Sequence, residues 1–220
     1  KEKHYLFWTS YLLCVAGLLG VTITGDAFNT FVFLEISSLS TYILIAMGSD
    51  KRALLASYRY LIMGTIGATF IVLGVGLLYA LTGTLNLLDI AERIGDVTDS
   101  RTKLAALAFL LVGISLKLAL FPLHAWLPNA YTYSPSVAST FLAATSTKVG
   151  IYLLIRFSFD IFGATKSFEN LGISQLLMFL SIIAIIYGSV AAIFENNLKK
   201  LFAYSSISQI GFITLGISLV

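Results

Sequence analysis

Three ionisable residues lie inside apolar stretches of the sequence, where a charge is costly. Glu35 lies in FVFLEISSLSTYILIAMG, Lys117 in FLLVGISLKLALFP and Lys148 in ASTFLAATSTKVGIYLLIRF. A charge at the centre of a bilayer costs about 2.5–3.5 kcal/mol on insertion scales, so such residues usually face the interior of a helix bundle and mark an ion pathway. We therefore predict that these three residues take part in proton translocation.

Hydroxyl side chains accompany two of these charges at helical spacing. Ser38 follows Glu35 by three residues, whereas Thr145 and Tyr152 flank Lys148 at positions i−3 and i+4. Such hydroxyl groups can hold water and pass protons, so we predict that they support the pathway. Two structural alternatives stay open. Serine and threonine also let membrane helices pack closely, and Glu35 with one lysine would form a static ion pair between helices.

Pro122 interrupts the apolar segment that carries Lys117. Proline has no backbone N–H and crowds the carbonyl group four residues before it, so we expect the helix to break or kink one turn beyond Lys117. Backbone groups freed at membrane depth are tolerated where protein or a water-filled cavity satisfies them. His124, two residues further on, can gain or lose a proton near neutral pH. The alternative is an ordinary helix end with a lysine that reaches toward the membrane surface.

A movement of Glu35 relative to Lys117 would couple the two charges. A carboxylate within about 4–6 Å favours the charged form of a buried ammonium group. We therefore predict that the position of Glu35 decides whether Lys117 holds or releases its proton, and that Lys148 accepts the proton and passes it on.

The composition places these residues in a membrane protein. Of 220 residues, 58% are hydrophobic and 11% are charged, against about 25% charged residues in soluble domains. A spanning helix needs about 20 apolar residues. We predict spanning helices at residues 5–24, 27–48, 57–82, 103–121, 137–159, 171–194 and 201–220. The predicted fold class is an all-α integral membrane protein, a multi-span helical bundle with a broken helix.

One polar segment separates the third and fourth predicted spans. It carries apolar residues at a spacing that predicts a short helix at the membrane interface, namely Leu87, Leu88, Ile90 and Ile94.

Several functions are disfavoured by the residue types present. Cys14 is the single cysteine, and His4 and His124 are the two histidines, so we expect no disulfide, iron–sulfur cluster or haem. The net charge of +3 is spread over loops, which argues against a nucleic-acid partner. We expect no metal, no cofactor and no catalysis by this chain alone.

Three segments together resemble a known family. They are GDAFNTFVFLEISSLS, KLALFPLHAWLPNAYTYSPSVASTFLAATSTKVGIYLLIRF and NNLKKLFAYSSISQIGF. This combination is similar to the antiporter-like, proton-translocating membrane subunits of respiratory complex I, membrane-bound hydrogenases and Mrp-type Na⁺/H⁺ antiporters. The first segment looks most like the D-type component of Mrp antiporters or the hydrogenase branch.

The resemblance implies roles for individual residues. Glu35 corresponds to the family's glutamate on its fifth helix, Lys117 to the lysine on its broken seventh helix, and Lys148 to the connecting lysine on its eighth. His124 stands at the histidine of the PLHAWLP block, and Arg59 falls where a basic residue often begins the sixth helix.

The resemblance also implies a domain organisation. The family contains two inverted five-helix repeats, each a half-channel. Residues 1–160 would be the first repeat, helices four to eight of the family, and residues 161–220 would begin the second with helices nine and ten. We expect the chain to be part of a longer subunit. Gln209 departs from the pattern, because many relatives have a histidine there.

The predicted function is therefore proton translocation, with cation/proton antiport as a variant. The chain would belong to an Mrp-type antiporter or to a respiratory or hydrogenase complex in a prokaryotic cell membrane. Its partners would be other membrane subunits, the lipid bilayer and H⁺, with Na⁺ left open. These residues do not separate redox-driven pumping from secondary antiport. The alternative is a structural scaffold subunit whose buried ion pairs are static.

Overall fold

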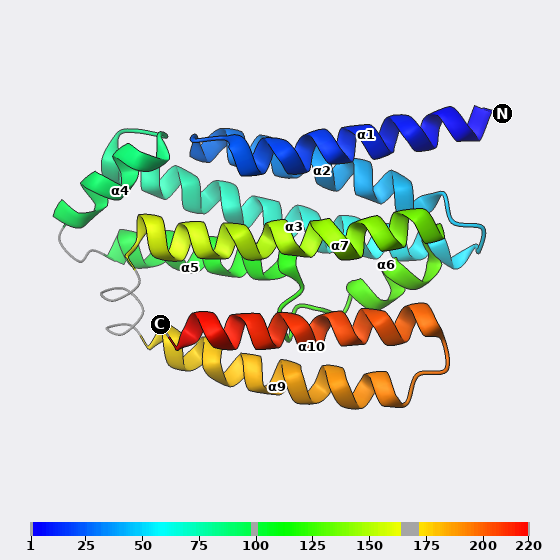
Figure 1. Cartoon of the computed structure of the whole chain (residues 1–220). Coiled ribbons are helices and arrows are strands. Elements are labelled where there is room, and N and C mark those ends of the chain that lie inside the picture. Colours follow the sequence, from blue (N-terminus) through cyan, green and yellow to red (C-terminus); the bar gives the residue numbers. More distant parts are fainter. Residues whose placement is uncertain (1, 98–100, 164–171, 220) are drawn as a thin grey trace.

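The computed structural model describes residues 2–97, 101–163 and 172–219, and these residues form helices joined by short connections (Figure 1). The elements in chain order are α1 (Glu2–Ile23), α2 (Ala27–Ala46), α3 (Arg52–Thr82), α4 (Leu87–Asp96), α5 (Arg101–Leu118), α6 (Leu127–Tyr133), α7 (Ser136–Ile155), the π-helix η1 (Arg156–Ile161), α9 (Ile173–Ile193) and α10 (Leu198–Ser218). The described part contains no strand beyond an isolated bridge between Asp26 and Asn86.

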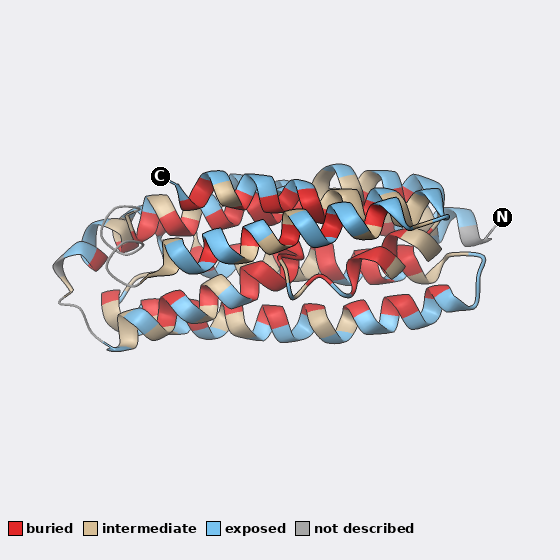
Figure 2. Cartoon of the chain, turned by 90° about the horizontal axis from the view of Figure 1, so that it is seen from below, coloured by how far each residue is buried: buried red, intermediate tan, exposed pale blue. Residues whose placement is uncertain are grey.

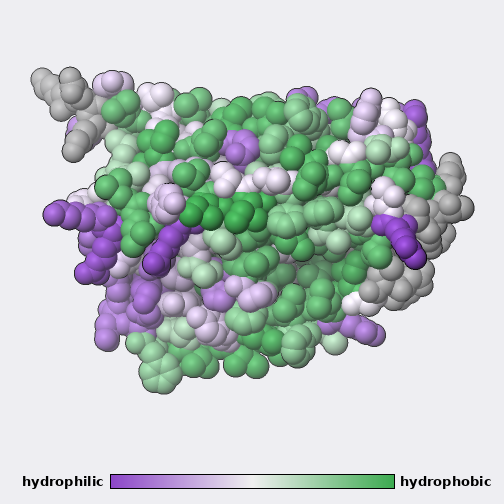
Figure 3. Space-filling model, turned by 180° about the vertical axis from the view of Figure 1, so that it is seen from behind, coloured by the Kyte–Doolittle hydropathy of each residue, from purple (hydrophilic) through white to green (hydrophobic). Residues whose placement is uncertain are grey.

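Six of these helical segments are long and apolar enough to cross a membrane. They are His4–Ile23, Ala27–Ala46, Arg52–Thr82, Ser136–Ile161, Ile173–Ile193 and Leu198–Ser218. The space-filling view in Figure 3 shows apolar side chains over much of the outer face of the bundle. The predicted fold class is thus confirmed, and the chain is an integral membrane protein. The predicted start of the sixth span, residue 171, lies outside the described residues.

The predicted fourth span, at 103–121, is present as helix α5 but does not meet those criteria. It has 18 residues, it ends at Leu118, and it carries Arg101, Lys103 and Lys117. Helical structure resumes in α6 only at Leu127. Helices α5 and α6 with the loop between them therefore form the expected broken helix.

The break begins earlier than predicted. We expected it one turn beyond Lys117, because of Pro122, but the helix ends one residue after the lysine. Ala119 has φ 61°, in the left-handed region, so the chain leaves the helix before the proline is reached. The backbone N–H of Leu120 donates to the carbonyl of Ser115 at 3.0 Å, which satisfies one of the freed groups.

Side-chain caps fix where three helices start. Asp26 accepts a hydrogen bond from a backbone N–H in the first turn of α2, and Asn86 and Asn197 do the same for α4 and α10. The Asp26–Asn86 bridge then joins the start of α2 to the start of α4. The predicted short helix is therefore present as α4. Its residues Ile90 and Ile94 are buried in the protein core, so its apolar face packs largely against the bundle.

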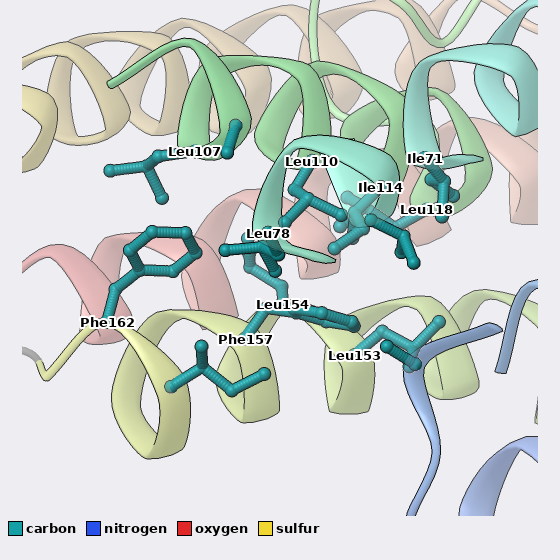
Figure 4. Close-up of a cluster of buried hydrophobic side chains, with 14 of the residues drawn as sticks. Ile71, Leu78, Leu107, Leu110, Ile114, Leu118, Leu153, Leu154, Phe157 and Phe162 are labelled. Atoms are coloured by element: carbon teal, nitrogen blue, oxygen red, sulfur yellow. The ribbon is translucent and has the colours of Figure 1, made fainter. Parts of the chain in front are cut away.

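One buried apolar cluster lies mainly along α3, α5 and α7, and a second joins α1, α2, α6 and α10. Figure 4 shows leucine and isoleucine side chains of α3 and α5 meeting leucines of α7 and Phe157 of η1. Gly113 lets α3 and α5 approach closely, because a Cβ there would lie 2.7 Å from the carbonyl oxygen of Gly67. Buried residues line the inside of the bundle and exposed ones its outside (Figure 2).

The α9–α10 pair is held by small and hydroxyl-bearing residues. A Cβ at Gly188 would lie 2.8 Å from the backbone nitrogen of Ser208, so the two helices are in backbone contact. The hydroxyl groups of Ser181 and Thr214 are hydrogen-bonded at 2.7 Å. This close packing is typical of helix pairs in membranes.

Candidate functional site

Glu35 and Lys117 meet in the interior of the bundle. Glu35 lies in α2 and Lys117 in the last turn of α5, and the Lys117 Nζ lies 3.3 Å from Glu35 Oε1. The lysine side chain is 5% exposed and the glutamate side chain 22%. Lys117 Nζ also donates to Ser38 Oγ at 2.7 Å. The ammonium group therefore has one charged and one neutral acceptor, both supplied by α2.

Ser38 differs from the other hydroxyl residues around it on α2. The hydroxyl groups of Ser37, Ser40 and Thr41 donate to backbone carbonyls of their own helix. Ser38 instead accepts from Lys117. The supporting role predicted for Ser38 therefore has a specific contact behind it, whereas its neighbours satisfy themselves locally.

An aromatic column connects α2 and α3 with the end of the broken helix. The Tyr42 ring meets Tyr60 edge-on at 4.8 Å, and Tyr60 stacks on Trp126 at 4.0 Å. Trp126 Nε1–H donates to the carbonyl of Leu116 at 3.1 Å. That carbonyl lies in the last turn of α5, so Trp126 satisfies an acceptor that the helix break sets free.

The sequence interpretation missed Tyr60 and Trp126. The role of Trp126 could have been predicted from the sequence, because a buried indole N–H usually donates to an acceptor and a broken helix has free carbonyl groups. The surroundings of Tyr42 could not have been foreseen. Its hydroxyl is buried against Gly64, so close that a Cβ on Gly64 would lie 2.0 Å from the hydroxyl oxygen. This hydroxyl has no hydrogen-bond partner among the described residues.

Lys148 is not joined to the Glu35–Lys117 pair. It is exposed on α7, and its Nζ donates to the carbonyl of Ala143 at 2.6 Å and to Thr147 Oγ1 at 3.4 Å. Both acceptors belong to its own helix. In the described arrangement the predicted relay thus has two of its three charges in contact.

The hydroxyl groups predicted to surround Lys148 have other partners. Thr145 Oγ1 donates to the carbonyl of Phe141 at 2.8 Å, and Tyr152 Oη donates to the carbonyl of Thr22 at 3.2 Å. Tyr152 therefore ties α7 to the end of α1. Both residues lie about one helical turn from Lys148, but their hydroxyl groups donate to other acceptors.

His124 lies in the loop of the broken helix and is 6% exposed. Its imidazole stacks on Phe121 at 5.2 Å and meets Tyr187 of α9 at 4.9 Å. Its Nδ1 atom is buried and has no hydrogen-bond partner within the described ranges. Pro122 is exposed in the same loop, and Arg59 is exposed on α3. Within the described part of the chain, neither of these two side chains contacts the Glu35–Lys117 pair.

No metal centre is found in the described part of the chain. Residues 2–97, 101–163 and 172–219 contain no group of three or more His, Cys, Asp or Glu residues that could hold a metal ion.

A bundle of apolar helices with a broken helix and a buried ion pair defines a class of membrane protein in which polar groups line a route through the bilayer. Within that class, residues 24–220 match the family described as NADH:quinone oxidoreductase/Mrp antiporter, transmembrane, and the chain belongs to this family. The resemblance drawn from the three sequence segments is confirmed.

Relatives from both branches of the family are similar to this chain. The N-type component of the NADH-quinone oxidoreductase of Desulforudis audaxviator is 45% identical over 96% of the chain and 42% of its own length. The D-type component of the Na⁺/H⁺ antiporter of Alkalihalophilus pseudofirmus is 32% identical over 100% of the chain and 43% of its own length. The chain therefore spans less than half the length of the relatives it matches.

A solved structure shares the fold. A chain of the membrane-bound sulfane sulfur reductase, an archaeal respiratory membrane complex, superposes with a TM-score of 0.86 at 34% identity. The match covers 95% of this chain and 42% of that one.

Proposed function

We propose that this chain is part of a membrane subunit that translocates protons, with Glu35 and Lys117 at the centre of the pathway. The observation that carries the proposal is the buried contact between Lys117 Nζ and Glu35 Oε1 at the end of a broken helix. The family supports it, since relatives are named as components of a quinone oxidoreductase and of a Na⁺/H⁺ antiporter.

The geometry couples the charge on Lys117 to the position of α2. Both acceptors of the ammonium group, Glu35 and Ser38, lie on that helix. In the low dielectric of a bundle interior, the interaction of two charges changes steeply with their separation. A shift of α2 relative to α5 would therefore change the proton affinity of Lys117 and drive uptake or release.

Transfer onward to Lys148 needs an intervening group. Lys148 is exposed on α7 and hydrogen-bonds to its own helix, so a water chain or a side-chain movement must bridge it to Lys117. His124, at the break, would exchange protons with the same pathway. Thr145, Tyr152, Arg59 and Pro122 would shape the surroundings of these carriers and not carry protons themselves.

The proposal extends to the ion, the partners and the repeats. H⁺ is the transported ion, and Na⁺ is the alternative suggested by the antiporter relatives. The chain works with other membrane subunits of a multisubunit complex, as does the solved archaeal relative, which is part of a respiratory membrane complex. Residues 1–160 form one half-channel and residues 161–220 begin the next repeat.

A structural scaffold is the second candidate function. It is favoured because Glu35 and Lys117 already pair with each other, whereas Lys148 takes no part in the contact. A static pair of this kind fixes helix register, and removing one partner destabilises the assembly. The two functions therefore differ in what is lost when Lys117 is replaced: proton flux or assembly.

Proton flux in proteoliposomes tests the proposal. The native complex is reconstituted with a pH-sensitive dye, and Lys117→Ala is compared with wild type at equal assembly of the complex. Lys51→Ala, which replaces an exposed lysine beside α3, serves as the matched control. We expect flux to be lost in Lys117→Ala and kept in Lys51→Ala. Flux that survives in Lys117→Ala, or that falls only in proportion to lost assembly, would show that the lysine is structural.

A further inference from the structure

We propose that Tyr187 and Tyr204 carry protons between His124 at the broken helix and the Glu195–Lys200 ion pair in the α9–α10 connection. The inference rests on the proposed proton translocation and adds an aqueous connection to it. The Glu35–Lys117 pair does not use these tyrosines, and the sequence interpretation did not single them out.

The inner end of this route is His124. Its side chain is more than nine-tenths buried, and its Nδ1 has no hydrogen-bond partner among the described residues. A buried polar atom without a partner carries a free-energy cost, so such an atom usually marks a place where another polar group arrives. An aromatic ring from beyond its own loop lies beside it, that of Tyr187 of α9, at 4.9 Å.

Two tyrosines continue from there toward the end of the hairpin. The rings of Tyr187 and Tyr204 lie 6.2 Å apart at an interplanar angle of 71°. Tyr187 belongs to α9 and Tyr204 to α10, so the route passes between the two helices of the hairpin. Each tyrosine hydroxyl can both donate and accept a hydrogen bond.

The outer end is an ion pair beside the connection between α9 and α10. Lys200 Nζ lies 5.8 Å from the centre of the Tyr204 ring, and the same ammonium group pairs with the Glu195 carboxylate. The Glu195 side chain is 22% exposed and that of Lys200 31%. Glu195 lies two residues beyond Ile193, where the apolar α9 span ends, so in a bilayer this end would lie near the surface, where water can deliver or remove protons.

The transfer leaves each tyrosine unchanged. A tyrosine hydroxyl accepts a proton on its oxygen and releases its own proton to the next group, so no O–H bond is gained or lost overall. Glu195 takes up one proton from water and returns to a carboxylate when it passes the proton on. His124 gains one proton and later gives it to the pathway.

Simple packing would not require these hydroxyl groups. Tyr187 is 40% exposed and lines a hollow on α9 with Ile183, Ile186 and Val190. A phenylalanine would fill the same apolar surroundings equally well. The hydroxyl group is therefore the atom whose removal separates a proton carrier from a packing residue.

The test uses Tyr187→Phe and Tyr204→Phe in the reconstituted native complex, with proton flux as the readout. Proton-transfer groups contribute about 10²–10⁴-fold to rates, so we expect flux to fall by about tenfold or more. Tyr79→Phe, an exposed tyrosine on α3, is the matched control and should keep wild-type flux. Tyr187→His restores a proton-exchanging ring and should recover part of the flux that Tyr187→Phe loses.

Lys117→Ala in the same preparation separates the two proposals. If Lys117→Ala abolishes flux while both phenylalanine variants match wild type, the tyrosine route is wrong and the proposed function stands. If Lys117→Ala keeps wild-type flux, both are overturned. Should Tyr187→Phe fail to assemble, Tyr204→Phe decides alone, because it removes one hydroxyl from a different helix.

Discussion

At the scale of single residues, the Glu35–Lys117 pair combines two demands. In the proposed pathway, the charges must be kept in the bundle, and one must remain able to exchange its proton. Buried ion pairs contribute little net stability because the cost of removing both charges from water offsets their attraction. Ser38 eases that cost by accepting a second hydrogen bond from Lys117 at 2.7 Å. Net stability therefore gives little reason for the pair, whereas the proposed proton transfer requires it.

Removing one charge and removing both should have different effects. Glu35→Gln leaves Lys117 buried without a carboxylate and should lower stability by about 3–5 kcal/mol. Glu35→Gln with Lys117→Met replaces the whole pair by uncharged groups, and we expect thermal stability in detergent to return close to wild type. Proton flux should be lost in both variants. Recovery of flux in the double variant would mean that the pair is not part of the pathway.

The charged residues of the candidate site could be chosen from the sequence because a charge in an apolar run is conspicuous at any register. Their contacts were less predictable. Tyr152 lies at i+4 from Lys148 but donates to Thr22, and spacing along one helix says nothing of which neighbouring helix offers an acceptor. Tyr187 and Tyr204 lacked a local signal, since tyrosines are common in membrane helices and only the fold brings Tyr187 to His124 and Tyr204 to Tyr187.

At the scale of elements, long apolar segments were predicted well because the membrane fixes their length. The position of the helix break was predicted less well, because the prediction considered only the effect of proline on its own helix. Ala119 departs from the helix three residues before Pro122, with φ 61°. A left-handed alanine is sterically unfavourable and is held by surrounding contacts, which a sequence window does not contain.

Trp126 should hold the end of α5 in place. In Trp126→Phe the ring can still stack on Tyr60, but the carbonyl of Leu116 loses the indole donor and keeps only the longer hydrogen bond from the Ala119 N–H at 3.4 Å. One intramolecular hydrogen bond contributes about 0.5–1.5 kcal/mol, so we expect a loss of thermal stability of that size. Trp8→Phe, which changes an exposed tryptophan on α1, should shift stability by less than about 0.5 kcal/mol. Equal stability of the two variants would contradict the role of the indole N–H.

At the scale of the whole molecule, the α9–α10 hairpin is linked to the broken helix by more than apolar contact. Lys199 Nζ donates to the carbonyl of Ser134, at the junction of α6 and α7, at 2.9 Å. Arg52 of α3 reaches Tyr133 at the same junction through a hydrogen bond of 3.3 Å. Helices α3 and α10, which are distant in sequence, are thus both hydrogen-bonded to the junction of α6 and α7.

Lys199→Ala should loosen this junction. A hydrogen bond from a charged donor contributes about 1.5–3 kcal/mol, and the partial exposure of this one places it at the low end of that range. Hydrogen–deuterium exchange should therefore become about tenfold faster in the first turns of α7 and α10. Lys51→Ala provides the comparison, because that lysine is exposed. Unchanged exchange in Lys199→Ala would show that apolar contacts alone hold the hairpin.

The close packing of α9 on α10 also bears on how the chain is built during biosynthesis. The most extensive helix contacts lie within the pairs α1–α2, α3–α5 and α9–α10. Gly188 and the Ser181–Thr214 bond need nothing outside their own pair. Each pair can therefore associate as soon as its second helix enters the bilayer, and the loop with His124 would contact Tyr187 only after the α9–α10 pair has arrived. The broken helix would then take up its position beside Tyr187 in a single step, when the α9–α10 hairpin docks.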